Sequence, residues 1–266
     1  MKKIKKMLVA VLGLMVASPV VMAAEPMINK EDKVVVGFDD TFAPFGFKDE
    51  KGNIVGFDVD LASAVFDKMG VEFEFQPIDW STKETELNTG NIDMIWNGYT
   101  ITDEREKVVT FSDAYMDNRQ VIIVKADNDI ESKADLADKV VATQAESSAL
   151  EAILADEAFT KTIDGATPIT YATFVEVFAD LDNGRADAIV VDETLATYYL
   201  SQKDNADSYR ILEDNFGEEE YAVGFRKSDS EFLEEFNAAL KSVTEEGTFD
   251  EIKAKWFVEI KNNQVH

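Results

Sequence analysis

The sequence has no cysteine and only one histidine, His266. Without cysteine there can be no disulfide, no thiolate nucleophile or metal ligand, and no site for the lipid anchor of a surface lipoprotein. A single terminal histidine argues against serine or cysteine triads and histidine-based zinc sites. No phosphate-binding glycine loop occurs either. We therefore expect no enzyme activity, no catalytic residue, no metal and no cofactor.

Basic residues are half as frequent as acidic ones. The 26 lysines and arginines stand against 53 aspartates and glutamates, which gives a formal net charge of −27 at pH 7. Such a surface repels nucleic acid and anionic lipid, so we expect no nucleic-acid partner. The acids are spread along the whole chain, which favours solubility or salt adaptation over attraction of cationic ligands as their cause.

Long apolar runs are also scarce. One run, from Met7 to Ala17, follows four lysines and is too short to cross a bilayer. Small residues at Val21 and Ala23 then match the requirement of signal peptidase. This pattern predicts a signal peptide over residues 1–23 and a free periplasmic protein. An uncleaved amphipathic anchor is the alternative.

Apolar runs of strand length alternate with segments of helical period along the rest of the chain. This alternation predicts an α/β fold with mainly parallel sheets. Strands are expected at Val34–Val36, Val71–Phe75, Ile92–Trp96, Val121–Val124, Val140–Ala142 and Ala188–Val191, and helices at Leu61–Met69, Ser148–Leu154 and Phe174–Leu181.

An internal repeat adds information about the domains. Leu87–Ile95 and Leu181–Ile189 share Leu, Gly, Asp and Ile at the same offsets, and each is typical of a helix end, a glycine cap and a following strand. Lys33–Val35 and Lys139–Val141 are a weaker pair. The repeat predicts two similar lobes, although such turns are common in α/β proteins. Because open α/β sheets bind ligands beyond the carboxyl ends of their strands, facing lobes would form a cleft.

Four ordered blocks carry a family resemblance: Gly56–Ala62, Gly98–Arg105, Phe111–Tyr115, and Gly247–Phe249 with Lys255–Phe257. They resemble the bacterial polar-amino-acid solute-binding proteins (extracellular solute-binding protein family 3), which include glutamine-, histidine- and lysine/arginine-binding proteins. The resemblance covers Val34 to Phe257. It implies the two-lobed periplasmic binding protein fold of type II, with a mainly parallel sheet flanked by helices in each lobe and a two-strand hinge.

The resemblance also implies a function. The protein would bind a free L-amino acid between its lobes, close about the hinge and deliver the ligand, as a monomer, to the membrane permease of an ABC transporter. We expect lobe 1 at residues 24–119 and 222–266, lobe 2 at 120–221, and hinge crossings near Arg119–Val121 and Glu220–Ala222. A periplasmic cyclohexadienyl dehydratase shares this fold and is the enzymatic alternative. Docking to a chemoreceptor is compatible with transport.

Two charged residues would hold the ligand's backbone. Arg105 lies early in a helix that Thr102 is expected to cap, where the helix dipole disfavours a cation. The resemblance implies that Arg105 pairs with the ligand α-carboxylate, an exposed ion pair being the alternative. It implies that Asp192 binds the α-ammonium, a helix cap being the alternative. Asp58 is expected to be a structural N-cap of the helix Leu61–Met69.

The resemblance implies further contacts in the first lobe. Gly98 and Thr100 would supply backbone and hydroxyl hydrogen bonds. Phe42 and Trp80 match positions where relatives sandwich the ligand side chain, although such aromatics are more often core. Asp39 matches an acid that reaches the end of that side chain in several relatives. Aromatic walls with an acid suit a cationic head and favour arginine or lysine, with glutamine, histidine and cystine as alternatives.

The second lobe would contribute the loop before the helix Ser148–Leu154. Gln144, Ser147 and Ser148 occupy this loop, and the two serines could donate hydroxyl and backbone hydrogen bonds to the ligand carboxylate. Relatives usually carry a glycine-threonine turn there. The missing glycine is a departure from the family pattern.

Overall fold

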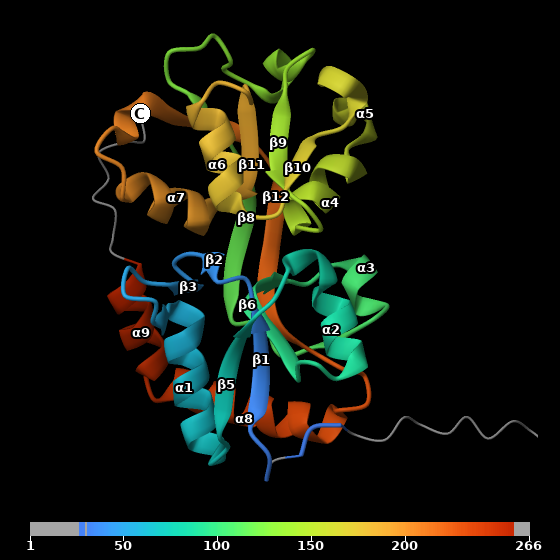
Figure 1. The fold of residues 1–266 in the computed structure, drawn as a ribbon, viewed down its shortest axis with the longest axis vertical. Coiled ribbons are helices and arrows are strands. Elements are labelled where there is room, and N and C mark those ends of the chain that lie inside the picture. The colour runs from blue at the N-terminus through green and yellow to red at the C-terminus, as the bar shows by residue number, and fades with distance from the viewer. Residues whose placement is uncertain (1–26, 30, 258–266) are drawn as a thin grey trace, which may run out of the picture.

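The computed structural model describes residues 27–29 and 31–257. Two long strands, β8 (Met116–Lys125) and β12 (Tyr209–Phe225), run side by side through the middle of the molecule and join two lobes (Figure 1). This is the two-lobed α/β architecture that the sequence predicts. No helix in the described ranges is long and apolar enough to span a membrane. The expected signal peptide and His266 lie outside these ranges.

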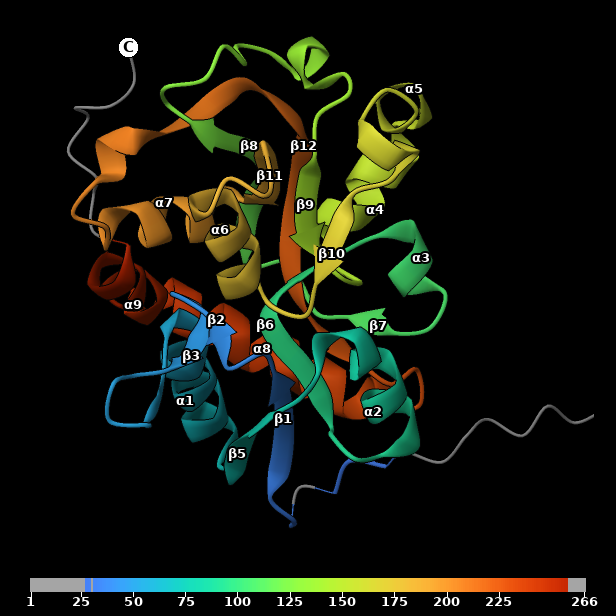
Figure 2. The same cartoon turned by 45° about the horizontal axis from the view of Figure 1, so that its top comes forward.

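The lobe that contains the N-terminal strands is a parallel sheet with helices on both faces. Strand β1 lies between β5 and β6 and is parallel to both. Helices α1 and α2 lie on opposite sides of this sheet (Figure 2). The elements are β1 (Val34–Phe38), β5 (Phe73–Pro77), β6 (Met94–Thr100), β7 (Thr110–Phe111), α1 (Phe57–Met69), α2 (Lys83–Thr89), α3 (Asp103–Glu106), α8 (Ser230–Glu245) and α9 (Thr248–Trp256), with a small sheet of β2 (Thr41–Phe42), β3 (Gly46–Lys48) and β4 (Ile54–Val55).

The other lobe repeats this plan. Its strand β9 lies between β10 and β11 and is parallel to both. Antiparallel pairs join each lobe to the long strands: β11 pairs with β8 in this lobe, and β6 and β7 pair with β12 in the other. The elements are β9 (Val141–Gln144), β10 (Ile169–Tyr171), β11 (Ala188–Asp192), α4 (Ser148–Ala155), α5 (Glu157–Thr160), α6 (Phe174–Asp182) and α7 (Glu193–Ser201).

The internal repeat corresponds to one structural device used in each lobe. A glycine with positive φ follows each of the two helices, α2 and α6. Asp93, which leads into β6, accepts a hydrogen bond from the backbone N–H of Val35 at 2.9 Å. Asp187, which leads into β11, accepts one from Val140 at 2.9 Å. Each aspartate thus links its strand to the neighbouring parallel strand.

The apolar side chains of α8 show how the sequence packs this lobe. Buried residues recur with helical period on one face, which lies against α1 and the sheet. Phe236 contacts Trp96 of β6 with ring centroids 5.2 Å apart, and Phe66 of α1 contacts the same indole at 6.3 Å. The C-terminal part of the chain therefore completes the core of the N-terminal lobe.

One expected helix cap was wrong. Helix α1 begins at Phe57, and its N-cap is Gly56, with no side-chain cap bond. Asp58 is fully buried inside the first turn, where its Oδ2 accepts a hydrogen bond from the backbone N–H of Gly98 at 2.8 Å. Burial raises the pKa of Asp58 to about 7. A contact 40 residues away along the chain has replaced the local one.

Candidate functional site

A narrow cavity lies between the lobes, beyond the carboxyl ends of β1, β6, β9 and β11. This is where parallel α/β sheets place their binding residues, because side chains from several strands converge there. Nine of the ten predicted site residues line this cavity, together with Asn97 and Phe174, which the sequence analysis did not select. The lining residues are Asp39, Phe42, Trp80, Asn97, Gly98, Arg105, Gln144, Ser147, Ser148, Phe174 and Asp192.

Thr100 is the predicted residue that does not line the cavity. Its hydroxyl lies 3.0 Å from the Ser148 hydroxyl and donates to Glu219 at 3.0 Å. Its carbonyl accepts from the Arg105 guanidinium at 2.9 Å. Thr100 therefore positions two lining residues, one from each lobe.

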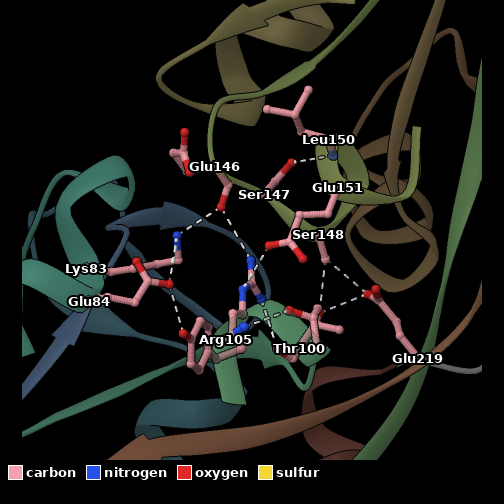
Figure 3. Close-up of polar contacts among 12 residues, drawn as sticks. Lys83, Glu84, Thr100, Arg105, Glu146, Ser147, Ser148, Leu150, Glu151 and Glu219 are labelled. Carbon is pink, nitrogen blue, oxygen red and sulfur yellow. Dashed lines mark hydrogen bonds and ion pairs between the residues drawn. The ribbon is translucent and has the colours of Figure 1, made fainter. Parts of the chain in front are cut away.

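Arg105 is buried, with 4 % of its surface exposed, so the alternative of an exposed ion pair was wrong. Thr102 caps the short helix α3 as predicted and accepts from the Arg105 backbone N–H at 3.2 Å. The guanidinium lies over the ring of Tyr99, 4.6 Å from its centroid. Its Nε is 3.4 Å from a Glu151 carboxylate oxygen but is not aligned for a hydrogen bond (Figure 3). The guanidinium plane is thus held against the Tyr99 ring at the cavity wall.

Glu146 lies in the turn for which the family resemblance leads us to expect a glycine. Its φ of 53° lies in the left-handed region that glycine favours, so this glutamate adopts the conformation of the missing residue. Its carbonyl accepts hydrogen bonds from Lys83 at 2.9 Å and from Arg105 at 3.3 Å (Figure 3). Burial, followed by the charge of Arg105, lowers the pKa of Lys83 to about 8. Two cations of one lobe therefore reach a single backbone oxygen of the other.

The two serines of this turn have different roles. Ser147 is the N-cap of α4: its hydroxyl accepts from the backbone N–H of Leu150 at 3.1 Å and donates to the carbonyl of Gln144 at 2.8 Å. The Ser148 hydroxyl is 3.2 Å from the amide nitrogen of Gln120, on a strand that joins the lobes. The first turn of α4 is thus fixed, and its two serines line the cavity.

Aromatic rings form the apolar walls. Phe42 is stacked on Phe45 and lies 5.8 Å from Phe174 of the opposite lobe, measured between ring centroids. Trp80 makes an edge contact with Tyr99 at 5.8 Å. Phe42 and Trp80 line the cavity and are also largely buried. Each ring therefore belongs both to the hydrophobic core and to the cavity wall.

Asp39 contacts the opposite lobe directly. Its Oδ2 accepts a hydrogen bond from the Gln144 side-chain amide at 2.8 Å. Its Oδ1 accepts from the backbone N–H of Thr41 at 2.9 Å, which fixes the turn before Phe42. Burial raises the pKa of Asp39 above its ordinary value.

Asp192 stands at the N-cap position of α7, but its side chain makes no cap bond, so the capping alternative was wrong. Its Oδ1 instead accepts from Asn118 at 2.8 Å, Gln120 at 2.9 Å and the Tyr221 hydroxyl at 2.6 Å. Burial, followed by the charge of nearby Glu219, raises the pKa of Asp192 to about 7. Asp192 is thus a buried acid, and a cation that binds beside it would favour its ionised form.

Sequence reasoning missed four residues of this region. Asn97 directly follows a predicted strand, and Phe174 is the first residue of a predicted helix. These positions at element ends were the signal that could have identified them. Lys83 and Glu219 lie among many other charged residues and had no distinguishing local pattern. In the described ranges, no group of three histidines, aspartates or glutamates could hold a metal ion.

Comparison with known proteins agrees with this architecture. The bacterial extracellular solute-binding proteins, family 3, match residues 34–259. An arginine-binding extracellular protein of Bacillus subtilis (strain 168) is 34 % identical over 85 % of this chain and 86 % of its own length. A histidine-bound ABC transporter substrate-binding protein from Streptococcus pneumoniae has a TM-score of 0.82 and 40 % identity, with 85 % of this chain and 92 % of that chain covered. An ancestral arginine-binding protein bound to arginine has a TM-score of 0.79 and 40 % identity, with coverages of 86 % and 100 %. The chain belongs to the bacterial extracellular solute-binding proteins, family 3.

Proposed function

We propose that the protein binds a free L-amino acid in the cavity between its lobes and delivers it, as a monomer, to the permease of an ABC transporter. The observation that carries this proposal is the presence of Arg105 and Asp192, from different lobes, in the lining of one cavity. A zwitterion offers a carboxylate to the guanidinium fork and an ammonium to the buried acid. The names of the related proteins, which bind amino acids, support the same function.

We further propose that the bound amino acid is arginine or lysine. Phe42, Trp80 and Phe174 provide aromatic surfaces, and Asp39 provides a buried carboxylate beside them. Aromatic faces attract a guanidinium or ammonium group, and a buried carboxylate gains a partner when such a group binds. The arginine-binding relative supports this choice, whereas the histidine-bound relative makes histidine the main competitor.

The lobes would move about β8 and β12. We propose the hinge at Arg119–Val121 and Glu220–Ala222, with lobe 1 at residues 24–119 and 222–266 and lobe 2 at 120–221. The contacts Lys83–Glu146 and Asp39–Gln144 cross between the lobes and are available only when these lie together. A ligand that touches both lobes favours the closed state for the same reason.

A thermal-shift screen tests the proposed function. The twenty L-amino acids, ornithine, citrulline and cystine are added separately, and the unfolding temperature is recorded. We expect the largest increases with L-arginine and L-lysine, about 5–10 °C at a hundredfold excess over Kd. Stabilisation by histidine or glutamine alone would contradict the cationic assignment. No stabilisation by any compound, together with turnover of arogenate or prephenate, would contradict the proposed function.

A glycine substitution tests the cavity wall. Gly98 has a φ of 58°, and a Cβ there would lie 2.8 Å from the ring of Phe42. We expect Gly98→Ala to lower affinity for the stabilising amino acid at least about tenfold, because the aromatic wall must move. Gly52→Ala is the matched control, since Gly52 also has positive φ, 82°, but nothing within 4 Å. Both variants lose stability through backbone strain, and only the first should lose affinity in calorimetry. Equal affinities would count against this wall.

A further inference from the structure

Two acidic residues meet where the long strands pass the cavity. The strand registers place Asp192 of β11 opposite Gln120 of β8, and Glu219 of β12 opposite Asn118 of β8. Residues two apart on a strand point to the same face, so the side chains of Asn118 and Gln120 lie together. The acids from the two flanking strands therefore converge on the same pair of amides.

The amide groups bridge the two carboxyl groups. The Asn118 nitrogen donates to Asp192 Oδ1 at 2.8 Å and to Glu219 Oε1 at 2.6 Å. The Gln120 nitrogen donates to the same two oxygens at 2.9 Å and 2.8 Å. The carbonyl oxygens of both amides are buried without a hydrogen-bond partner in the described structure. Both amides thus direct their donors toward the acids, as expected for a site of concentrated negative charge.

No lysine or arginine in the described ranges forms an ion pair with either acid. Besides the two amides, the Tyr221 hydroxyl donates to Asp192, and the hydroxyls of Thr100 and Ser148 donate to Glu219, so every donor on the pair is neutral. The charged groups on the neighbouring elements pair elsewhere: Arg119 with Glu193, and Arg105 with Glu151. Asp192 is buried and Glu219 is half-buried, so the two neighbouring carboxylates cannot both ionise cheaply, because neutral donors do not cancel their charge.

We propose that Asp192 and Glu219 act as a carboxyl pair that shares one proton before the ligand binds and releases it when the ligand's α-ammonium arrives. This inference rests on the proposed function and adds Glu219 as a positioning residue. The ammonium supplies the positive charge and hydrogen-bond donors that the proton had supplied, so the proton leaves to solvent. Because Asp192 has a raised pKa, about 7, the exchange falls in the neutral range.

The sign of the pH dependence follows from this exchange. Asp192 in the ligand-free pair is protonated below about pH 7 and ionised above it, whereas it stays ionised when the ligand is bound. Affinity therefore rises with pH to about 7 and levels off until the ligand's α-ammonium begins to lose its own proton at higher pH. Each pH unit below this range lowers affinity up to about tenfold, because one proton must be displaced.

Calorimetry in buffers of different ionisation enthalpy measures the released proton directly. L-Arginine and L-glutamine are the probes, since neither side chain titrates between pH 5.5 and 8.5. We expect about three-quarters of a proton to be released per ligand at pH 6.5 and about one quarter at pH 7.5, where the ligand's α-ammonium still keeps its own proton. Binding without proton release at pH 6.5 would overturn the inference while leaving the proposed function intact. No binding of either probe, in heat or in thermal shift, would overturn both.

Two glutamine variants identify the acid. Glu219→Gln keeps an acceptor but removes the charge, so we expect proton release at pH 6.5 to fall by at least half; the proton count does not depend on the absolute affinity. Glu213→Gln is the matched control, because Glu213 is an exposed acid on the same strand and outside the proposed hinge, and it should keep the wild-type count. Equal counts in the two variants would show that Glu219 has no part in the pair.

Discussion

Replacement of Arg105 by alanine should weaken amino-acid binding by roughly a hundredfold to several thousandfold, which corresponds to about 3–5 kcal/mol. The guanidinium is buried and is held by the Thr100 and Glu146 carbonyls. Its removal would leave the ligand α-carboxylate in a desolvated cleft without its counter-charge. Titration calorimetry with L-arginine and with the best ligand from the thermal-shift screen measures the change. A loss below tenfold would contradict the proposed role.

A conservative variant separates charge from geometry. Arg105→Lys keeps the positive charge but loses the planar fork that can hold a carboxylate with two hydrogen bonds. We expect it to recover only part of the affinity that alanine loses. Unfolding temperatures of the ligand-free variants show whether the fold is preserved, since Arg105 also contacts Glu146 of the opposite lobe. Full recovery by lysine would mean that Arg105 acts as a simple point charge.

Replacement of Asp192 by asparagine should change binding and stability in opposite directions. Asparagine cannot neutralise the ligand α-ammonium, so affinity should fall by about 2–5 kcal/mol. Asparagine carries no charge, however, and Asp192 is a buried carboxyl without a cationic partner in the described structure. The ligand-free variant should therefore be at least as stable as the wild type at pH 8.

The pH dependence of this stability difference has a definite sign. The pKa of Asp192 is about 7 in the folded protein and near 3.9 when unfolded, so the unfolded chain ionises first as pH rises. Wild-type protein therefore loses stability from this group between about pH 4 and pH 7, and asparagine does not. We expect the gain in unfolding temperature to grow through this range and to level off above it. A variant that is less stable at pH 8 and binds normally would contradict both assignments.

Local patterns were sufficient for the secondary structure, whereas the candidate site residues came from the family resemblance. Alternation of strands and helices, and the glycine caps of the repeat, depend on neighbours within a few residues, and the structure confirms these elements. The repeat also anticipated equivalent lobes, because Asp93 and Asp187 make the same bond to the adjacent strand. Thr102 was a correct cap for a similar reason, since its partner Arg105 is only three residues away.

Long-range contacts decided the roles of Asp58, Glu146 and Glu219, which local patterns could not predict. Asp58 seemed a local cap in the sequence, but Gly98 provided a better donor in the folded core. Glu146 takes a left-handed conformation, and carbonyl contacts with Lys83 and Arg105 accompany it. Nothing in an acidic stretch distinguished Glu219 from its neighbours.

The sequence by itself therefore determined the α/β alternation, the duplicated lobes and the residue types able to hold a zwitterion, because each of these depends on periodicity or on side-chain chemistry. Only the tertiary structure decided which acid pairs with Asp192 and which backbone oxygen receives the cations. The physical reason is that such partners come from strands and turns that are distant in sequence, and the register of β8, β11 and β12 brings the acids together only after folding.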